Sequence, residues 1–394
     1  MSSPIIYLDN AATSYPKPER VYEKIVAFGK SLGANPGRAL YKMAVDAGEE
    51  YERARQAVAR FFGVGDPSRI VFTMNATDGI NMALKGILRA GDHVVSSTFE
   101  HTCVLRPLNR LAKEGCIELA RVPPEADGRL SPERIARAMQ KNTRLVVVTH
   151  VSNVIGILQP VQEIAEAAHG RGALVMIDSA QATGVVPMDV EELGLDVMAT
   201  TGHKSLFGPP GTGVLYVREG VDISPWREGG TGDSEEFQPE KFPVRLEGGT
   251  LNTWGVVALA EGIRFLEEVG VEKVHEKESR LAGMVFAALG EDERIFLYGP
   301  SDAPRTGILT FNLCGVAPPI VGNILDERFG ICVRTGLHCA PGAHALYDQP
   351  EGGVRVSPGW FTTEENIKTL IDAVREIADE LAKEPAVRRG AAGT

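Results

Sequence analysis

Residues 174–217 read LVMIDSAQATGVVPMDVEELGLDVMATTGHKSLFGPPGTGVLYV, and they contain three short apolar runs separated by polar and glycine-rich connections. The runs cover residues 174–177, 197–200 and 213–217, and none shows the polar alternation of a strand with one exposed face. Apolar runs of this length are typical of strands that are buried on both faces of a sheet. The stretch therefore predicts the centre of an α/β domain with a mostly parallel sheet.

The same pattern continues towards the N-terminus. Further apolar runs at residues 70–73, 93–96 and 145–149 predict strands, because each is short and bounded by polar or turn residues. Helical patterns at 132–139 and 161–171 lie between these runs. They predict the crossover helices that a parallel sheet requires.

The C-terminal third has a different pattern. Helical periodicity near residues 256–269 continues to residue 289, and short strand-like runs follow near 307–312 and 331–334. A final helix is predicted at 363–383, where threonines and glutamates provide an N-terminal cap. We therefore expect a large α/β domain over residues 15–260, a smaller α+β domain formed by residues 1–14 and 261–394, and a disordered tail at 384–394.

The charge balance restricts the kind of partner. The chain has 394 residues and a formal net charge of -11. An acidic protein is disfavoured as a ligand of nucleic acid or of an anionic membrane, because both select basic surfaces. No apolar run reaches the roughly 18 residues that span a bilayer, and residues 1–9 lack the pattern of a secretion signal. We therefore expect a cytoplasmic protein whose partners are small molecules or other proteins.

Two charged residues follow neighbouring predicted strands. Asp178 comes directly after the run at 174–177, and Lys204 comes shortly after the run at 197–200. Because the carboxyl ends of parallel strands meet at one edge of a sheet, both side chains are expected in the same cleft. A buried Asp178 needs a cation or a hydrogen-bond donor, for which an arginine is the ordinary partner. Lys204 either binds an aldehyde cofactor or extends to solvent.

A third strand end offers a phosphate site. The run at 70–73 is followed by NATD at residues 75–78 and then by a helical pattern. A helix N-terminus at this edge binds phosphate through backbone N–H groups, with the Thr77 hydroxyl beside them. The simpler interpretation makes Thr77 or Asp78 an ordinary helix N-cap.

Residues 334–342, RTGLHCAPG, form a loop around Cys339. Its turn residues exclude regular structure, and His338 and Arg334 can support a reactive thiolate. The alternative is a small, buried apolar cysteine. A metal site built from His338, Cys339 and His344 lacks a further ligand nearby, so no metal is predicted. The five cysteines of the chain include no CxxC pair, so a disulfide framework is not expected either.

Eight short motifs stand in one order along nearly the whole chain. Taken together they resemble the cysteine desulfurase and selenocysteine lyase family, class V of the fold-type I pyridoxal-phosphate (PLP) enzymes. The resemblance implies a PLP-dependent transferase fold, with a large, mostly parallel domain and a smaller α+β C-terminal domain. The motifs are YLDNAAT at 7–13, ATDGIN at 76–81, EH at 100–101, HVSN at 150–153, DSAQ at 178–181, TGHK at 201–204, GGT at 248–250 and RTGLHC at 334–339.

The resemblance also implies roles for residues around the cofactor, pyridoxal 5'-phosphate. Lys204 is expected to bind it covalently, and Asp178 to pair with the pyridine nitrogen so that the ring acts as an electron sink. Gln181 is expected to bond the ring oxygen. His101 is expected to stack on the ring and to take part in catalysis. The remaining cofactor contacts are expected from Ala76, Thr77, Asn153, Thr201 and His203, and from Thr250 of the other subunit of a homodimer.

The implied reaction converts L-cysteine into L-alanine and leaves a persulfide on Cys339. Arg355, with Asn153 and Arg334, is expected to bind the carboxylate of L-cysteine or L-selenocysteine, because a planar guanidinium suits a carboxylate. The short loop before Cys339 is similar to that of group II or Suf-type enzymes. A short loop implies a sulfur-acceptor protein that reaches into the site.

Several alternatives stay open at this point. Tyr41 and Leu337 stand where the family often has histidine, so the substrate is undecided between cysteine and selenocysteine. A selenocysteine lyase would use the same residues. Another class V enzyme, such as an aminotransferase, an epimerase or a C–S lyase, would keep Lys204 and Asp178 without needing Cys339. A binding scaffold without turnover is disfavoured by the presence of all three of these residues.

Overall fold

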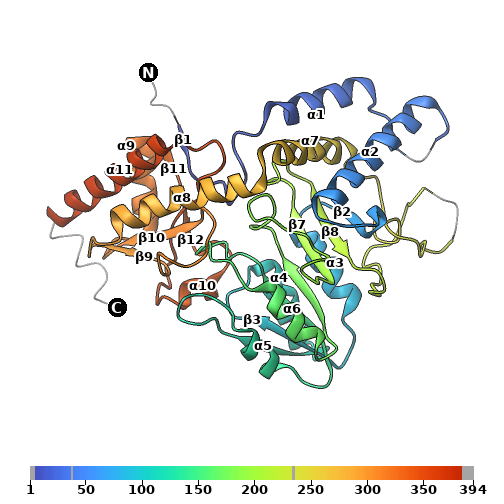
Figure 1. Cartoon of the computed structure of the whole chain (residues 1–394), viewed down its shortest axis with the longest axis horizontal. Helices are drawn as coiled ribbons and strands as arrows, with labels where there is room; N and C mark the ends of the chain where they lie inside the picture. Colours follow the sequence, from blue (N-terminus) through green and yellow to red (C-terminus); the bar gives the residue numbers. More distant parts are fainter. Residues whose placement is uncertain (1–4, 37–38, 233–235, 384–394) are drawn as a thin grey trace.

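The computed structural model of the chain describes residues 5–36, 39–232 and 236–383. A seven-stranded sheet and a four-stranded sheet organise it, with helices packed around both (Figure 1). The tail at 384–394, for which we predict disorder, lies outside the described residues. Within the described residues, no helix has the length and apolar character needed to cross a membrane.

The seven-stranded sheet forms the centre of the larger part. Its spatial order is β2-β8-β7-β6-β5-β3-β4, and only β8 runs antiparallel to its neighbours. The predicted mostly parallel sheet is therefore confirmed. The strands are β2 (Ile70–Thr73), β3 (Asp92–Ser97), β4 (Ile117–Val122), β5 (Thr143–Thr149), β6 (Leu174–Asp178), β7 (Val197–Thr201) and β8 (Gly213–Val217).

Both faces of this sheet are covered. In β5, Leu145 and Val147 join one apolar cluster, whereas Val146 and Val148 join another, so consecutive side chains pack on opposite faces. This double burial explains why the sequence of the strand shows no polar alternation. Helices α3 (Ala76–Ile87) and α4 (Thr102–Lys113) contribute to the first cluster, and α2 (Lys42–Phe61), α5 (Pro132–Ala138), α6 (Val161–His169) and α7 (Thr253–Val269) contribute to the second.

Strand β4 is the element of this sheet that the sequence did not predict. It lies at the edge, beside β3. Ile117 and Val122 are buried, but Glu118 and Arg121 between them are exposed. An edge strand of mixed polarity does not give the continuous apolar signal of the central strands.

The smaller part is built around the four-stranded sheet, of order β12-β13-β10-β9. The run predicted as one strand at 331–334 is divided, because its two halves belong to different sheets. Ile331–Cys332 is β11, which pairs with the N-terminal strand β1 (Ile6–Tyr7), so that β1 lies among the C-terminal elements (Figure 1). The other elements are β9 (Ile295–Leu297), β10 (Leu309–Leu313), β12 (Arg334–Gly336), β13 (Gly353–Val356), α8 (Val271–Leu289), α9 (Pro318–Phe329), α10 (Pro341–Ala345) and α11 (Glu364–Lys383).

The bounds of α7 and the cap of α11 bear on two predictions from the sequence. Helix α1 (Glu19–Ser31) lies beside α7 (Figure 1). Helix α7 runs through residue 260 without a break, so the domain boundary predicted at that residue stays a prediction. Helix α11 begins with the predicted cap: the Thr363 hydroxyl accepts from the amide of Asn366 at 3.2 Å, and the Asn366 side chain accepts from the amide of Thr363 at 3.0 Å.

Hydrogen bonds join the loops at the carboxyl ends of the large sheet to the smaller part. The amide of Thr102, after β3, donates to the carbonyl of Cys339 at 2.8 Å. After β5, the carbonyl of Val154 accepts from the Thr310 hydroxyl at 2.6 Å. These contacts bring the cysteine loop to the strand edge where the sequence places the cleft.

Candidate active site

A cavity of about 270 Å³ opens at the carboxyl ends of the parallel strands. Its walls come from the loops that follow β2, β3, β5, β6 and β7. Every residue predicted to contact the cofactor lines it, with the exception of Thr250, which is exposed in the single chain. The lining residues are Asn75, Ala76, Thr77, His101, Cys103, Thr149, Val151, Asn153, Asp178, Ala180, Gln181, Thr201, His203 and Lys204.

Lys204 provides an amine inside this cavity rather than at the protein surface. Burial lowers its pKa to about 8, against an opposing effect of the nearby Asp178 carboxylate, and Arg355 lowers the pKa further. A lower pKa leaves a larger fraction of the amine neutral near pH 7 to 8, and only the neutral amine is a nucleophile or a base. Its place in the cavity lining favours a binding role over the alternative that Lys204 extends to solvent.

Asp178 is buried, and it lies in the cavity wall. One oxygen accepts from the amide of Ala180 at 3.0 Å, and the other accepts from the thiol of Cys103 at 3.4 Å. The arginine that the sequence suggested as its ordinary partner is not among its hydrogen-bond partners in the described residues. Burial and the carboxylate together raise the pKa of Cys103, so this thiol stays protonated and can donate.

The N-terminus of α3 forms another wall of the cavity. Asn75 is the N-cap, because its side chain accepts from the amide of Asp78 at 2.9 Å, so neither Thr77 nor Asp78 has the capping role that the simpler interpretation gave it. The Asp78 carboxylate accepts in return from the amide of Met74 at 3.0 Å. This arrangement leaves the first amides of the helix, at Ala76 and Thr77, as donors at the cavity wall.

Two histidines of the cavity are neutral. His101 is the N-cap of α4, where Nδ1 accepts from the amide of Cys103 at 3.1 Å, so the ring proton lies on Nε2. Burial lowers the pKa of His101, and the positive charge of Lys204 adds to this effect. Burial also lowers the pKa of His203 to about 4, helped by Lys204 and Lys17. Both rings can therefore donate one hydrogen bond without adding positive charge.

The segment from residue 13 to 17 holds the backbone just before Lys204. The carbonyl of His203 accepts from the Thr13 hydroxyl at 2.9 Å, from the amide of Ser14 at 3.0 Å and from the Lys17 ammonium at 3.0 Å. The ammonium donates as well to the hydroxyl of Ser14 at 2.8 Å. These contacts fix the peptide that carries Lys204 from the side of the N-terminal segment.

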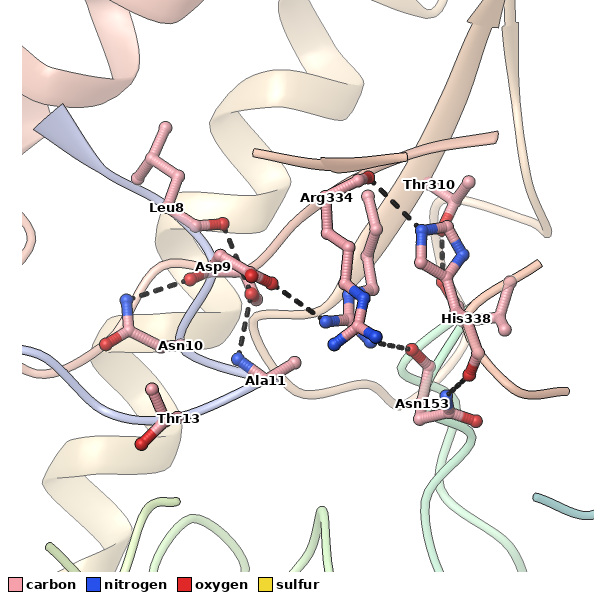
Figure 2. Close-up of polar contacts among 12 residues, drawn as sticks. Leu8, Asp9, Asn10, Ala11, Thr13, Asn153, Thr310, Arg334 and His338 are labelled. Carbon is pink, nitrogen blue, oxygen red and sulfur yellow. Dashed lines mark hydrogen bonds and ion pairs between the residues drawn. The ribbon is translucent and has the colours of Figure 1, made fainter. Parts of the chain in front are cut away.

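Cys339 lies in a strained loop directly after β12. His338 and Cys339 both have left-handed backbone conformations, with φ of 50° and 57°. The side-chain amide of Asn153 donates to the carbonyl of His338 at 2.6 Å and holds the loop against the cavity (Figure 2). Cys339 itself is exposed, so the alternative of a buried apolar cysteine is wrong.

Arg355 lies behind this loop and is only 2% exposed. One terminal nitrogen donates to the Asp9 carboxylate at 2.9 Å, and the other donates to the carbonyl of Asn153 at 3.1 Å. Its Nε is buried and has no hydrogen-bond partner among the residues that the structure describes. Arg334, by contrast, is exposed, and its positive charge lies close enough to act on Arg355.

The side chain of His338 does not have the role that the sequence suggested. Nε2 bonds to the carbonyl of Arg334 at 3.1 Å, as Figure 2 shows, and Nδ1 bonds to His344 at 3.2 Å. Both ring nitrogens are engaged in the interior, so this ring is not free to support the thiolate of Cys339.

Glu100 is a residue whose importance the sequence did not reveal. Its carboxyl group is buried beside Asp178 and accepts hydrogen bonds from the Ser97 hydroxyl and the amide of Thr149. Burial raises its pKa to about 8, and the charge of Asp178 adds to this effect. The resemblance includes Glu100 in a motif but gave no reason for an acid at that position.

The raised pKa of Glu100 predicts a pH-dependent stability difference between wild type and Glu100→Gln. The folded state binds the proton more tightly than the unfolded state, whose pKa is near the ordinary 4.5. Wild type therefore loses stability relative to the variant as the pH rises from about 4.5 to about 8, by up to roughly 1.4 kcal/mol per pH unit. Urea unfolding of both proteins at several pH values measures the difference, and a difference that does not change with pH would contradict the prediction.

Comparison with known proteins agrees with this geometry. The profile of the family "Aminotransferase class-V" matches residues 6–370. A probable cysteine desulfurase of Methanothermobacter thermautotrophicus is 36% identical over 384 residues, which are 95% of this chain and 94% of that protein. A cysteine desulfurase of Escherichia coli K12 is 34% identical over 385 residues, covering 95% of this chain and 93% of its own length.

Solved structures give the same result for the fold. The apo structure of a cysteine desulfurase from Thermococcus onnurineus superimposes with a TM-score of 0.90, at 32% identity, over 95% of both chains. The cysteine desulfurase CsdA of Escherichia coli gives a TM-score of 0.86 at 29% identity, over 96% of this chain and 95% of that one. The predicted fold class and family are therefore confirmed. This chain belongs to the class V aminotransferase family, whose members depend on PLP and among which its named relatives here are cysteine desulfurases.

Proposed function

We propose that this protein is a PLP-dependent cysteine desulfurase in which Lys204 holds the cofactor and Cys339 receives the sulfur of L-cysteine. One observation carries the proposal: an exposed cysteine stands in a strained loop that is hydrogen-bonded to the rim of a cavity containing a buried lysine and aspartate. An aminotransferase or an epimerase needs the lysine and the aspartate but has no use for the cysteine.

The residues around the cavity fit PLP by their chemistry. The Lys204 amine suits the aldehyde, the Asp178 carboxylate suits the pyridine nitrogen, and the first amides of α3 suit the phosphate. When bound, PLP supplies an electron sink for the α-carbon of an amino acid. The further contacts that we propose are Gln181 to the ring oxygen, His101 on the ring face, Asn153 beside it, Ala76, Thr77, Thr201 and His203 around the phosphate, and Thr250 from the second subunit of a homodimer.

The substrate carboxylate is proposed to bind at Arg355. Its terminal nitrogens already have partners, but its Nε is a buried donor without one in the described part of the chain. An unsatisfied donor of this kind is costly to bury, and an entering carboxylate satisfies it. Arg334 supplies a second positive charge at the exposed side, and Asn153 links the site to the cysteine loop through His338.

The groups of this chain then have separate tasks. Lys204, once free of the cofactor, takes the α-proton, for which its pKa of about 8 is well suited. The thiolate of Cys339 attacks the substrate sulfur, so that a sulfur–sulfur bond forms while the bond from that sulfur to the substrate carbon breaks. The carbon keeps the electron pair of the broken bond and takes up a proton, Lys204 returns the α-proton, and the product leaves as alanine. The sulfur stays on Cys339 as a persulfide.

The exposed position of Cys339 bears on what happens to the persulfide. Leu337, two residues before it, is 42% exposed, so the same loop presents an apolar side chain to solvent. We propose that a sulfur-acceptor protein contacts this loop, because the loop is too short and too firmly bonded to carry the sulfur away. In this chain Leu337 takes the place of a histidine that the family often has, and it suits an apolar contact.

The proposal is tested by incubating the purified protein with L-cysteine and a reductant, and quantifying alanine and sulfide. Wild type is expected to form both. Cys339→Ala is expected to form neither, whereas Cys314→Ala is the matched control, since Cys314 is also exposed but lies outside the cavity and the loop. Equal alanine from Cys339→Ala and wild type would exclude the persulfide route. Alanine from L-selenocysteine alone would favour a selenocysteine lyase.

Asp9 is expected to control substrate affinity through Arg355. Its carboxylate fixes one terminal nitrogen of the guanidinium, so Asp9→Ala frees the side chain to rotate. Loss of one such charge-assisted hydrogen bond, worth about 1.5 kcal/mol, is expected to raise KM for L-cysteine roughly tenfold with little change in kcat. Asp9→Asn keeps an oxygen acceptor and is expected to stay much closer to wild type. A similar KM for Asp9→Ala and wild type would show that Arg355 does not need this anchor.

A further inference from the structure

A chain of three buried side chains lies beneath the Cys339 loop. The Tyr298 hydroxyl is 3.2 Å from Nδ1 of His344, and Nε2 of His344 is 3.2 Å from Nδ1 of His338. Nε2 of His338 then reaches the carbonyl of Arg334 at 3.1 Å. Tyr298 and His344 are fully buried, and His338 is 5% exposed.

The proton positions in this chain follow from its two ends. A carbonyl oxygen only accepts, so Nε2 of His338 carries a proton and its Nδ1, in the neutral ring, is an acceptor. His344 must then donate from Nε2, which leaves its own Nδ1 as an acceptor for the Tyr298 hydroxyl. The Tyr298 hydroxyl also donates to the carbonyl of Gly352 at 3.0 Å, so its single proton is shared between this carbonyl and Nδ1 of His344. The two bonds of the His338 ring each have one donor and one acceptor.

Both rings are neutral in this arrangement. Burial lowers the pKa of His338 to about 3, and the nearby Arg355 contributes to this shift. Burial lowers the pKa of His344 to about 4. Neutral rings with fixed tautomers have a fixed orientation, because turning either ring would place two donors or two acceptors face to face.

The last ring of this hydrogen-bonded series is that of His338, the residue just before Cys339. Both of these residues have left-handed backbone conformations, which are unfavourable for residues other than glycine. Such a conformation persists only when its surroundings hold it. The side chain of His338 is bonded at both nitrogens, and its carbonyl is bonded to Asn153, so this residue is held on both sides.

We propose that Tyr298, His344 and His338 are positioning residues that hold Cys339 in its strained, exposed conformation at the mouth of the cavity. The inference rests on the proposed role of Cys339 as the sulfur acceptor. It assigns His338 no proton transfer, although His338 is the neighbour of the reactive cysteine. Its function passes through the backbone rather than through contact with the substrate.

Substitutions at His344 provide a matched test. His344→Gln places an amide nitrogen near the position of Nε2 and keeps a donor for His338, whereas His344→Leu fills similar space without one. His344→Leu is expected to lower kcat for L-cysteine roughly tenfold with KM nearly unchanged, and His344→Gln is expected to recover most of the loss. Tyr298→Phe removes only the hydroxyl, keeps the packing of the ring, and is expected to lower kcat about threefold to tenfold. It serves as a second variant if His344→Leu does not fold.

Hydrogen exchange supplies a readout that does not depend on turnover. The amides of Thr102 and Ala340 are bonded to the carbonyls of Cys339 and Leu337, so they report whether the loop is held. Both amides are expected to exchange at least about tenfold faster in His344→Leu, while those of β6 stay unchanged and His344→Gln stays close to wild type.

Failure of this inference is distinguishable from failure of the proposed function. If wild type forms no alanine from L-cysteine, the proposed function fails. The exchange measurement still decides whether Tyr298, His344 and His338 hold the loop. Unchanged exchange in both His344→Leu and Tyr298→Phe overturns the inference. Equal loss of kcat in His344→Leu and His344→Gln also overturns it, because the hydrogen bond would then not be what matters.

Discussion

Lys204→Ala is expected to lower the rate of alanine formation from L-cysteine by roughly a thousandfold or more. The variant loses both the amine that we propose to hold the cofactor and the base that takes the α-proton, and proton transfer alone typically contributes 10²–10⁴ in rate. The rate is measured as alanine released under single-turnover and steady-state conditions, with excess PLP supplied. Lys141→Ala, at an exposed position away from the cavity, is the control and is expected to keep wild-type activity.

Chemical rescue separates the two roles of the amine. A small primary amine added to Lys204→Ala is expected to restore part of the proton transfer, because it can occupy the space that the shortened side chain leaves in the cavity. The absorbance of the cofactor measures loading independently. Wild-type turnover in Lys204→Ala without added amine would exclude this lysine from the chemistry.

The second large effect concerns stability. Glu247→Ala is expected to lower the free energy of unfolding by about 3–5 kcal/mol, because it leaves a buried cation without its partner. The Arg55 guanidinium donates to both oxygens of Glu247, at 2.8 and 2.9 Å, and both side chains are nearly inaccessible to solvent. The amide of Phe72 also donates to Glu247, at 2.7 Å, so the loss reaches the backbone of β2.

The matched control for this substitution is Glu52→Ala. Glu52 also pairs with Arg55, at 3.1 Å, but its side chain is 56% exposed. Exposed pairs contribute little, so the expected loss is below about 1 kcal/mol. Urea unfolding measures both variants. The double variant Arg55→Met with Glu247→Leu is expected to regain much of the stability that Glu247→Ala loses. A similar loss of stability in Glu247→Ala and Glu52→Ala would show that burial of the pair does not cause the effect.

Much of the fold could be predicted from local sequence patterns. The strands at 70–73 and 213–217 have the bounds that the apolar runs indicated, because residues buried on both faces leave a signal that needs no knowledge of their neighbours. The edge strand β4 has one partner and a mixed pattern, so its signal is weak. The run at 331–334 reads as one strand, but the chain passes from one sheet to another within it, and periodicity carries no information about that change.

The sequence indicates where some residues of the site lie, but not how others are bonded. Lys204 and Asp178 follow strands at one edge of the sheet, so topology alone brings them together. The cap of α3 was assigned to the wrong residue because Asn75, Thr77 and Asp78 are all good caps and only the start of the helix decides among them. The orientation of His338 depends on a contact with His344 and on Asn153, which is 185 residues away in the sequence. No local pattern contains such a contact.

The N-terminal segment has a consequence for the order in which the protein is assembled during synthesis. Strand β1 pairs with β11, Asp9 pairs with Arg355, and the amide of Ala11 donates to the Ser357 hydroxyl at 2.9 Å. Residues 6–11 thus leave the ribosome more than 300 residues before the partners with which they pair, at 331–357. The parallel sheet can form on the growing chain, but Arg355, which we propose to bind the substrate carboxylate, can pair with Asp9 only after the chain has been made through residue 355. A nascent chain arrested before that point would contain the strands of the large sheet that lead into the cavity, but not the arginine that we propose for the substrate carboxylate.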